Sequence, residues 1–447
     1  FAQGPSVVVL RVFAPTVFFS GILGVLRGYF QAHRSMAQTS VSQIIEQLIN
    51  ALLSIGAAIL LINVFVGSLS FGDDAALNTK HSMYGAVGSA IGTGSGVVFA
   101  LLFMLFIYAV NRPIFHKRLM RDRSPQVDTY QAIIASILRV VTPFILSTAV
   151  YQLNAPINIS LFRAFFSTSS TESVDLQAQI ATNYGVFQNA TTISNIPIVF
   201  ASAMAVTLIP TLTQAIYLRH YKTARRQIHT ATKITMLISM PCAVGLVTLA
   251  EPIYGFLFRN SDAMVRTLGG NLLRILAISV IFFALSTLTN SCLQGLGKVS
   301  APIRNALIAL FVQTIVLVAL LWRLQLDIYS LVIVSNLYAL LLCVLNFISI
   351  HRALGLHSHI FTAFIRPLFA SFFMGAMSWA TYNGLILLTL PGDIALILAV
   401  LVGGICYFIM LLLVRGVSEQ ELARFPKGHL LVRVAHKLRL LHKNSPL

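Results

Sequence analysis

Residues 11–31 read RVFAPTVFFSGILGVLRGYFQ, and this stretch decides the class of fold. The fifteen residues between Arg11 and Arg27 carry no charge. An α-helix rises about 1.5 Å per residue, so about 20 apolar residues cross the hydrocarbon core of a bilayer. The stretch therefore predicts a transmembrane helix. Ser20, Arg27 and Gln31 follow one another at helical spacing and place polar groups along one face of it.

The composition of the whole chain extends this prediction. The 447 residues are 57% hydrophobic and only 10% charged, with a mean hydropathy of +0.83. A water-soluble domain carries about 25% charged residues, so the composition excludes a soluble globular protein. The four cysteines all lie inside apolar stretches without metal-ligand or disulfide spacing, which is typical of small buried hydrophobes.

Membrane-length apolar runs recur along the chain, each bounded by charge, proline or glycine. We predict eleven crossings of an all-α polytopic membrane protein. Their approximate spans are 7–30, 40–63, 83–110, 132–157, 181–212, 231–250, 270–294, 302–322, 327–350, 359–387 and 391–415.

The positive charge of +18 lies mostly in alternate loops, which indicates a membrane flank and not a nucleic-acid surface. One set of loops holds Arg34, Arg112, Lys117, Arg118, Arg121, Arg123, Arg219, Lys222, Arg225, Arg226, Lys233, Lys298, Arg304, Arg352 and a basic tail at 416–447. The opposite set holds Lys80, Arg163, Arg259, Arg266 and Arg323 among most of the acids. We therefore expect a protein of the inner or plasma membrane with a cytoplasmic C-terminus. The tail is either a helix on the anionic leaflet or a disordered segment.

A weak internal repeat relates two of the runs at an offset of 263 residues. Residues 11–31 align without gaps on 274–294, which read RILAISVIFFALSTLTNSCLQ. Six crossings separate the two, so both run in the same direction, as in two parallel six-helix halves. If the second half begins at the fourth run, the first half should contribute six runs before it. Only three runs are present there, and the chain starts at Phe1. The pattern predicts that about three helices of the first half are missing.

Polar residues within the runs predict a wet cavity along several helix faces. The candidate lining residues are Arg11, Arg27, Gln31, Glu46, Asn50, Arg139, Asn154, Asn158, Gln188, Thr192, Asn195 and Arg274. For uncharged residues the alternative is hydrogen-bonding between helices. For Arg27 and Glu46 it is a mutual ion pair, and the other arginines can extend to headgroups.

Charge at membrane depth favours an anionic ligand. A charged side chain at mid-helix costs about 2.5–3.5 kcal/mol on insertion scales, and arginines outnumber acids within the runs. A guanidinium matches phosphate oxygens in a bidentate way, so a diphosphate is the expected guest. Glu46 is the acid that lies well within a run, and it is the candidate for proton coupling.

Two motifs carry a family resemblance. Arg27-Gly28-Tyr29-Phe30-Gln31, followed by Ser42-Gln43-Ile44-Ile45-Glu46-Gln47, resembles the SpoVB/YtgP branch of the MurJ-like lipid flippases, within the multidrug/oligosaccharidyl-lipid/polysaccharide (MOP) exporter superfamily. Asn195-Ile196-Pro197 and Gln294-Gly295-Leu296-Gly297-Lys298 are similar to further parts of that family.

The resemblance implies a MOP exporter fold of two six-helix lobes plus two C-terminal helices, here without the first three. Residues 1–110 would be the remainder of the N-lobe, 111–131 a cytoplasmic linker, 132–350 the C-lobe, 351–415 the two additional helices and 416–447 a basic tail. It also implies alternating access for a polyprenyl-diphosphate-linked precursor such as lipid II. The family's cavity arginines lie largely on helices that this chain lacks. Its sodium-binding acids have no counterpart here, so coupling to H⁺ or Na⁺ is open.

Other functions stay open at this stage. The same scaffold serves other lipid-linked polysaccharide or teichoic-acid units, or drugs, although an arginine-rich cavity disfavours cationic drugs. A membrane enzyme would need clustered Asp, His or Glu, which the sequence lacks, so we expect no catalytic residue, metal or cofactor. Membrane lipids are expected partners. A third possibility is a scaffold for cell-wall synthesis proteins.

Overall fold

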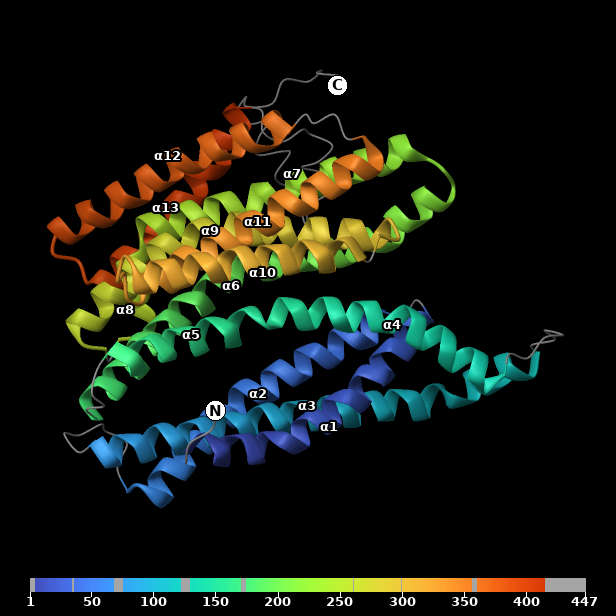
Figure 1. The fold of residues 1–447 in the computed structure, drawn as a ribbon, viewed down its shortest axis with the longest axis horizontal. Coiled ribbons are helices and arrows are strands. Elements are labelled where there is room, and N and C mark those ends of the chain that lie inside the picture. The colour runs from blue at the N-terminus through green and yellow to red at the C-terminus, as the bar shows by residue number, and fades with distance from the viewer. Residues whose placement is uncertain are drawn as a thin grey trace. The chain divides into compact units, whose positions relative to one another are not determined.

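The computed structural model describes residues 5–33, 36–67, 75–121, 129–169, 174–259, 261–298, 300–355 and 360–414. Within these ranges the regular secondary structure is entirely α-helical (Figure 1). The helices are α1 (Pro5–Ala32), α2 (Met36–Phe65), α3 (Ala75–Arg121), α4 (Tyr130–Gln152), α5 (Asn154–Ser169), α6 (Val174–Tyr217), α7 (Tyr221–Thr248), α8 (Ala250–Leu257), α9 (Ala263–Gly295), α10 (Ser300–Trp322), α11 (Tyr329–Leu354), α12 (Ile360–Leu387) and α13 (Gly392–Leu413). The basic tail predicted at 416–447 lies outside the described residues.

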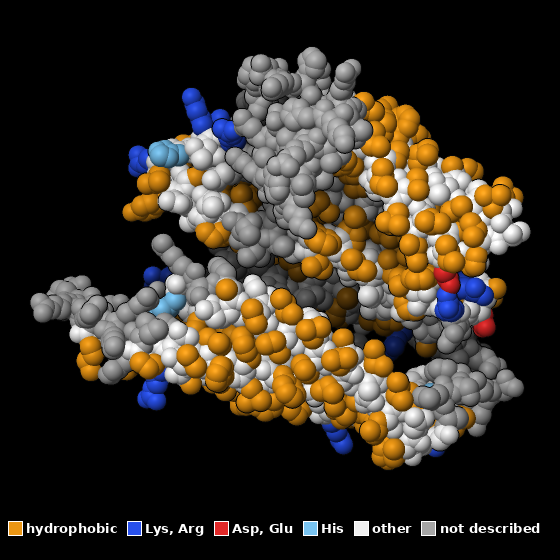
Figure 2. Space-filling view, turned by 180° about the vertical axis from the view of Figure 1, so that it is seen from behind, with side chains coloured by type: hydrophobic (Ala, Val, Ile, Leu, Met, Phe, Trp, Pro, Cys, Tyr) orange, Lys and Arg blue, Asp and Glu red, His pale blue; other side chains and the backbone are white. Residues whose placement is uncertain are grey.

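Every predicted run is helical, and eight described helices are long and apolar enough to cross a membrane. These are α1, α2, α3, α7, α9, α10, α11 and α13. Large apolar side chains face outward, for example Val25 (74% exposed), Phe106 (64%) and Phe311 (69%). Figure 2 shows hydrophobic side chains over much of the face in view. A bilayer is the solvent that accommodates this surface.

Three predicted boundaries differ from the structure. The segment 111–131, predicted as a linker, begins as helix because α3 continues to Arg121. The run 231–250 corresponds to α7 and continues into a short α8. The run 132–157, predicted as one helix, is broken at Leu153 and continues as α5 to Ser169. Pro156 explains the break, because proline has no N–H for the Gln152 carbonyl but fits the first turn of a new helix.

The chain divides into an N-terminal unit, Phe1–Asp128, and a C-terminal unit, Thr129–Leu447. In the N-terminal unit, α3 packs closely along α2 through three glycines four residues apart. A Cβ atom on Gly88 would lie 2.4 Å from Ala58 Cα, and one on Gly92 would lie 2.2 Å from Ser54 Oγ. One on Gly96 would lie 2.6 Å from the Glu46 carbonyl oxygen. Small residues at this spacing let membrane helices approach at the backbone.

The C-terminal unit has a large apolar core formed by α5 to α11. Tyr254 of α8 is fully buried in it, and its ring lies against Gly269 of α9, where a Cβ would be 2.3 Å from Tyr254 Cζ. The pair α12 and α13 packs on α7, and the Tyr407 hydroxyl donates to the Leu237 carbonyl oxygen at 2.8 Å. This packing fixes the positions of the helices that carry the polar residues of the C-terminal unit.

Candidate functional site

Arg27 and Glu46 meet inside the N-terminal unit. Arg27 Nη2 lies 2.7 Å from Glu46 Oε2, and Arg27 Nε donates to Ser42 Oγ at 2.8 Å. Ser42 is fully buried, and its hydroxyl donates to the Thr39 carbonyl oxygen at 2.9 Å. Glu46 and Ser42 lie four residues apart on α2, so one face of that helix holds the guanidinium of α1. Of the two alternatives for Arg27, the structure shows the ion pair.

The Arg27 guanidinium keeps some capacity for a further ligand. Its side chain is 17% exposed and that of Glu46 is 21% exposed. Nε and Nη2 are engaged, whereas Nη1 donates no hydrogen bond to any residue that the structure describes. A guanidinium carries five N–H donors, so the ion pair leaves donors for an anion without breaking existing bonds.

One turn beyond Glu46, Asn50 joins a smaller hydrogen-bonded cluster. Its Oδ1 accepts from Ser54 Oγ at 2.8 Å and from Thr93 Oγ1 of α3 at 3.2 Å. These bonds join α2 to α3 where the glycine contacts bring the two helices together. Asn50 therefore contributes to helix packing, as the alternative for uncharged residues predicts.

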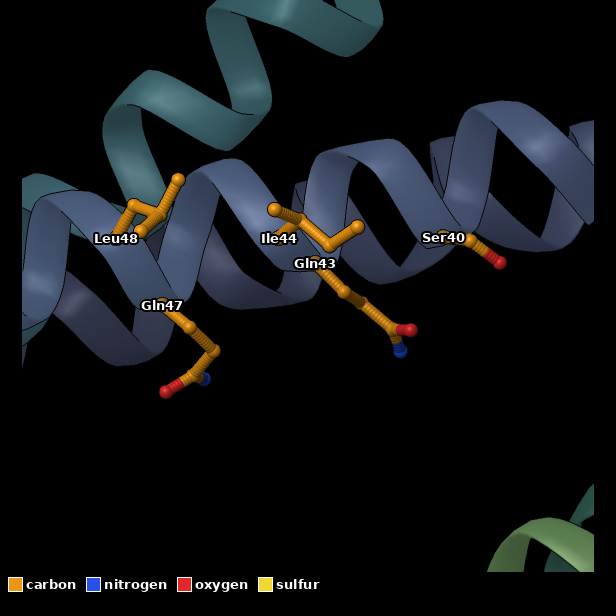
Figure 3. Close-up of a pocket in the computed structure, with 5 residues that line it drawn as sticks. All are labelled: Ser40, Gln43, Ile44, Gln47 and Leu48. Carbon is orange, nitrogen blue, oxygen red and sulfur yellow. The ribbon is translucent and has the colours of Figure 1, made fainter.

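A third face of α2 is polar and exposed. Gln43 and Gln47 project side by side from the helix, next to Ile44 and Leu48 (Figure 3). With Ser40 they line a shallow hollow of 470 Å³. Glutamines at membrane depth usually face protein or water and not lipid. The polar residues of this helix thus divide between faces that pair with α1 and α3 and a face that is open.

Four predicted residues line one cavity in the C-terminal unit. Asn154 and Asn158 of α5 face Gln188 and Asn195 of α6 around a volume of 130 Å³. The other walls come from α9 and α11. Thr192 lies between the two α6 residues but is exposed, and its hydroxyl donates to the Gln188 carbonyl oxygen at 2.9 Å. The polar residues of α5 and α6 therefore meet within one unit.

The floor of this cavity is held by amide-to-amide hydrogen bonds. Asn158 Nδ2 donates to Asn154 Oδ1, and Gln313 Nε2 of α10 donates to Asn158 Oδ1, each at 3.0 Å. Gln313 is fully buried and Asn158 is 7% exposed. This chain of side chains connects α10 to the start of α5, so it fixes the helix break at Leu153 relative to the core.

The remaining predicted residues do not join either group. Arg11, Gln31 and Arg139 are exposed, and among the described residues neither Arg11 nor Arg139 has an ion-pair partner. Arg274 is exposed as well, and its Nε donates to the Val247 carbonyl oxygen of α7 at 3.4 Å. That contact is typical of a cation at a helix C-terminus.

Sequence reasoning missed the residues that complete the two groups. Thr93 and Gln313 each bond a predicted residue, and Ser194 lines the cavity from α6. Gln313 had a usable signal, because it is a lone amide in a run that reads IALFVQTIVLVALL from Ile308. Ser194 and Thr93 had none, since isolated hydroxyls are common in membrane helices.

The fold of this chain is similar to folds of known structure. A helical membrane bundle with this arrangement is shared by the eukaryotic MATE transporter AtDTX14, whose crystal structure matches with a TM-score of 0.56 at 15% identity, over 81% of this chain and 71% of that one. The chain therefore has the MOP exporter fold. The structure titled "Lipid II flippase MurJ, inward closed conformation" matches with a TM-score of 0.52 at 13% identity, over 90% of this chain and 91% of that one.

The family follows from the sequence. The family model described as lipid II flippase MurJ matches residues 5–400, so the chain belongs to the MurJ family. A relative named lipid II flippase MurJ, from Bacillus subtilis (strain 168), is 26% identical over 324 residues. That alignment covers 72% of this chain and 56% of the relative, so the matched part spans little more than half of the relative's length.

Proposed function

We propose that this protein moves a polyprenyl-diphosphate-linked cell-wall precursor, lipid II, from the cytoplasmic to the outer leaflet of the bacterial cytoplasmic membrane. The observation that carries the proposal is the family match over residues 5–400. The expected orientation places the C-terminus in the cytoplasm. Alternating access would carry the headgroup across the membrane, while the polyprenyl tail stays in lipid beside α12 and α13.

The Arg27 and Glu46 pair suits the first step of such transport. A diphosphate needs positive charge at membrane depth, and a guanidinium binds phosphate oxygens through paired N–H donors. Glu46 neutralises Arg27 when no anion is bound, which lowers the cost of keeping the charge among apolar helices. In our proposal the diphosphate engages the donors that Glu46 and Ser42 leave free.

Glu46 is also our candidate for ion coupling. It is an acid within a transmembrane helix, and acids at that depth commonly carry protons or ions in transporters. Sodium coupling is the alternative, and transport measured across imposed proton and sodium gradients separates the two.

Complementation of a bacterial strain depleted of its lipid II flippase tests the proposed function. We expect the protein to restore growth and lipid II export. Purified protein in vesicles should also move lipid II faster than a teichoic-acid or capsule precursor lipid. Well-expressed, membrane-inserted protein that supports neither growth nor lipid II movement would overturn the assignment, and preferential movement of another precursor would replace the substrate.

A further inference from the structure

The cavity of the C-terminal unit is chemically unlike the Arg27 region. The described residues that line it all belong to α5, α6, α9 and α11. None of these fourteen residues is Asp, Glu, Lys, Arg or His. A diphosphate held there would lack a compensating cation, which makes the cavity unsuitable for the charged part of a lipid-linked substrate.

One hydroxyl in the cavity has no hydrogen-bond partner in the part of the chain that the structure describes. Ser194 is 3% exposed, and its Oγ atom lies buried without a partner among the described residues. Buried polar groups in proteins are nearly always paired, with protein, water or ligand. Most neighbouring hydroxyls donate to carbonyl oxygens of their own helices, as Ser279 does to Leu276 at 2.6 Å and Ser335 does to Leu331 at 2.7 Å. Ser194 is therefore the group that a bound ligand would satisfy.

The available groups offer donors and acceptors together. The hydroxyls of Ser279 and Ser335 are used as donors within their helices, so their oxygens can act only as acceptors toward a ligand. The side-chain amides of Gln188 and Asn195 each supply an N–H donor and a carbonyl acceptor. An anion needs donors only, and a metal cation needs acceptors only. A mixed set suits neutral groups that both donate and accept, namely hydroxyl and acetamido groups.

The size of the cavity and its open rim suit a single substituent of a sugar ring. A cavity of about 150 Å³ holds a benzene molecule, so 130 Å³ accommodates an acetamido or hydroxymethyl group but not a disaccharide. Gln188 and Asn195 are exposed at the rim, whereas Asn158 and Ser194 are buried at the floor. A ring resting on the α6 rim would thus direct one substituent inward.

We propose that this cavity recognises the sugar next to the diphosphate of the lipid-linked substrate, through its hydroxyl or acetamido groups. The inference rests on the proposed function and adds a sugar-selective subsite to it. Recognition of the neutral sugar by the C-terminal unit would be independent of the charge of the diphosphate. Selectivity among precursor lipids would then depend on the α5 and α6 amides.

Binding of three lipids to the purified protein tests this. The probes are undecaprenyl diphosphate alone, the same lipid with glucose, and the same lipid with N-acetylglucosamine. We expect the sugar-bearing lipids to bind more tightly than the bare diphosphate. Ser194→Ala should weaken binding of a sugar-bearing lipid about five-fold, the value of one neutral hydrogen bond, and leave the bare diphosphate unchanged. Asn195→Leu, at the exposed rim, should do the same.

Two controls separate recognition from folding. Removing an unpaired buried hydroxyl does not destabilise a protein, so Ser194→Ala should keep or raise the melting temperature. Ser239→Ala removes a buried α7 hydroxyl that donates to the Thr235 carbonyl oxygen at 2.9 Å, away from the cavity, and should leave all three affinities unchanged. Equal affinity for all three lipids, or no effect of either cavity variant, would mean that the cavity holds water only and would overturn the subsite. No binding of any of the three would instead overturn the proposed function.

Discussion

The carboxylate of Glu46 on α2 lies 2.7 Å from Nη2 of Arg27 on α1, and the same guanidinium donates through Nε to the buried Ser42 hydroxyl. Both bonds cross between helices whose other contacts with each other are few, because α1 packs mainly on α3. The pair therefore contributes to the placement of α1 as well as to the charge of the site.

A double-mutant cycle measures this contribution. Hydrogen bonds to charged groups contribute about 1.5–3 kcal/mol, so Arg27→Gln and Glu46→Gln should each lower stability in detergent and show a coupling energy in that range. Thermal or steric-trap unfolding of the four proteins gives the value. Coupling near zero would mean that the pair is equivalent to a solvated surface ion pair.

The same cycle separates packing from ligand capture. If Arg27 binds phosphate, the double variant should regain stability without regaining lipid II export, because no guanidinium is left. Recovery of export by the double variant would assign Arg27 to structure alone.

The glycines of α3 give a second prediction. A Cβ on Gly88 would overlap the Ala58 backbone at 2.4 Å, so Gly88→Ala should force α2 and α3 apart and cost about 2 kcal/mol. Gly85→Ala is the matched control, since its Cβ would meet only Ile62 Cδ1 at 3.9 Å and alanine is the better helix former. The melting temperature should fall for the first variant and hold or rise for the second. Equal melting temperatures would contradict the close contact.

Much of this architecture could be predicted because it depends on local sequence. Apolar length predicts the helices, and spacing by three and four puts Asn154 and Asn158 on one face of α5, where they line the cavity with Gln188 and Asn195 of α6. The helix break at Leu153 was missed, although Pro156 carries its signal, because the run continued to look apolar on both sides. The unpaired Ser194 hydroxyl could not be predicted, because its hydrogen bonding depends on which groups of α5, α9 and α11 lie near it in the folded structure.

The amide chain behind the cavity predicts non-additive stability effects. Gln313→Leu removes the donor to Asn158 Oδ1 and leaves a buried acceptor unpaired, at a cost of about 1–3 kcal/mol. Adding Asn158→Leu removes that acceptor, so the double variant should lose less stability than the sum of the two single variants. Unfolding of all three variants in one detergent measures the difference. Strict additivity would indicate that the two amides do not act together.

Asp327, in the turn between α10 and α11, predicts a pH dependence of stability. Burial raises the pKa of Asp327, and a backbone hydrogen bond at Ile328 offsets part of that rise. A carboxyl whose pKa is higher in the folded state favours folding most when it is protonated. Its contribution is complete below the ordinary carboxyl pKa and is lost as pH rises through the raised value.

Asp327→Asn tests the sign of this effect. Asparagine tolerates the positive φ of 49° at this position and carries no charge. The variant should be more stable than the parent at neutral pH, and the difference should disappear in acid. A parent that gains stability relative to the variant as pH rises would show that the folded state prefers the carboxylate.

The orientation predicted from the loop charges can be tested at the two ends of the segment formed by α7 and α8. Lys222 is exposed at the start of α7, and Asp262 is exposed just before α9. In a background without the four native cysteines, Asp262→Cys should react with a membrane-impermeant maleimide in right-side-out vesicles, and Lys222→Cys only in inside-out vesicles. The reason is that Lys and Arg are retained on the cytoplasmic side during insertion. The reversed labelling pattern would place the C-terminus outside, and labelling of both sites from one side would show that α7 does not cross the membrane.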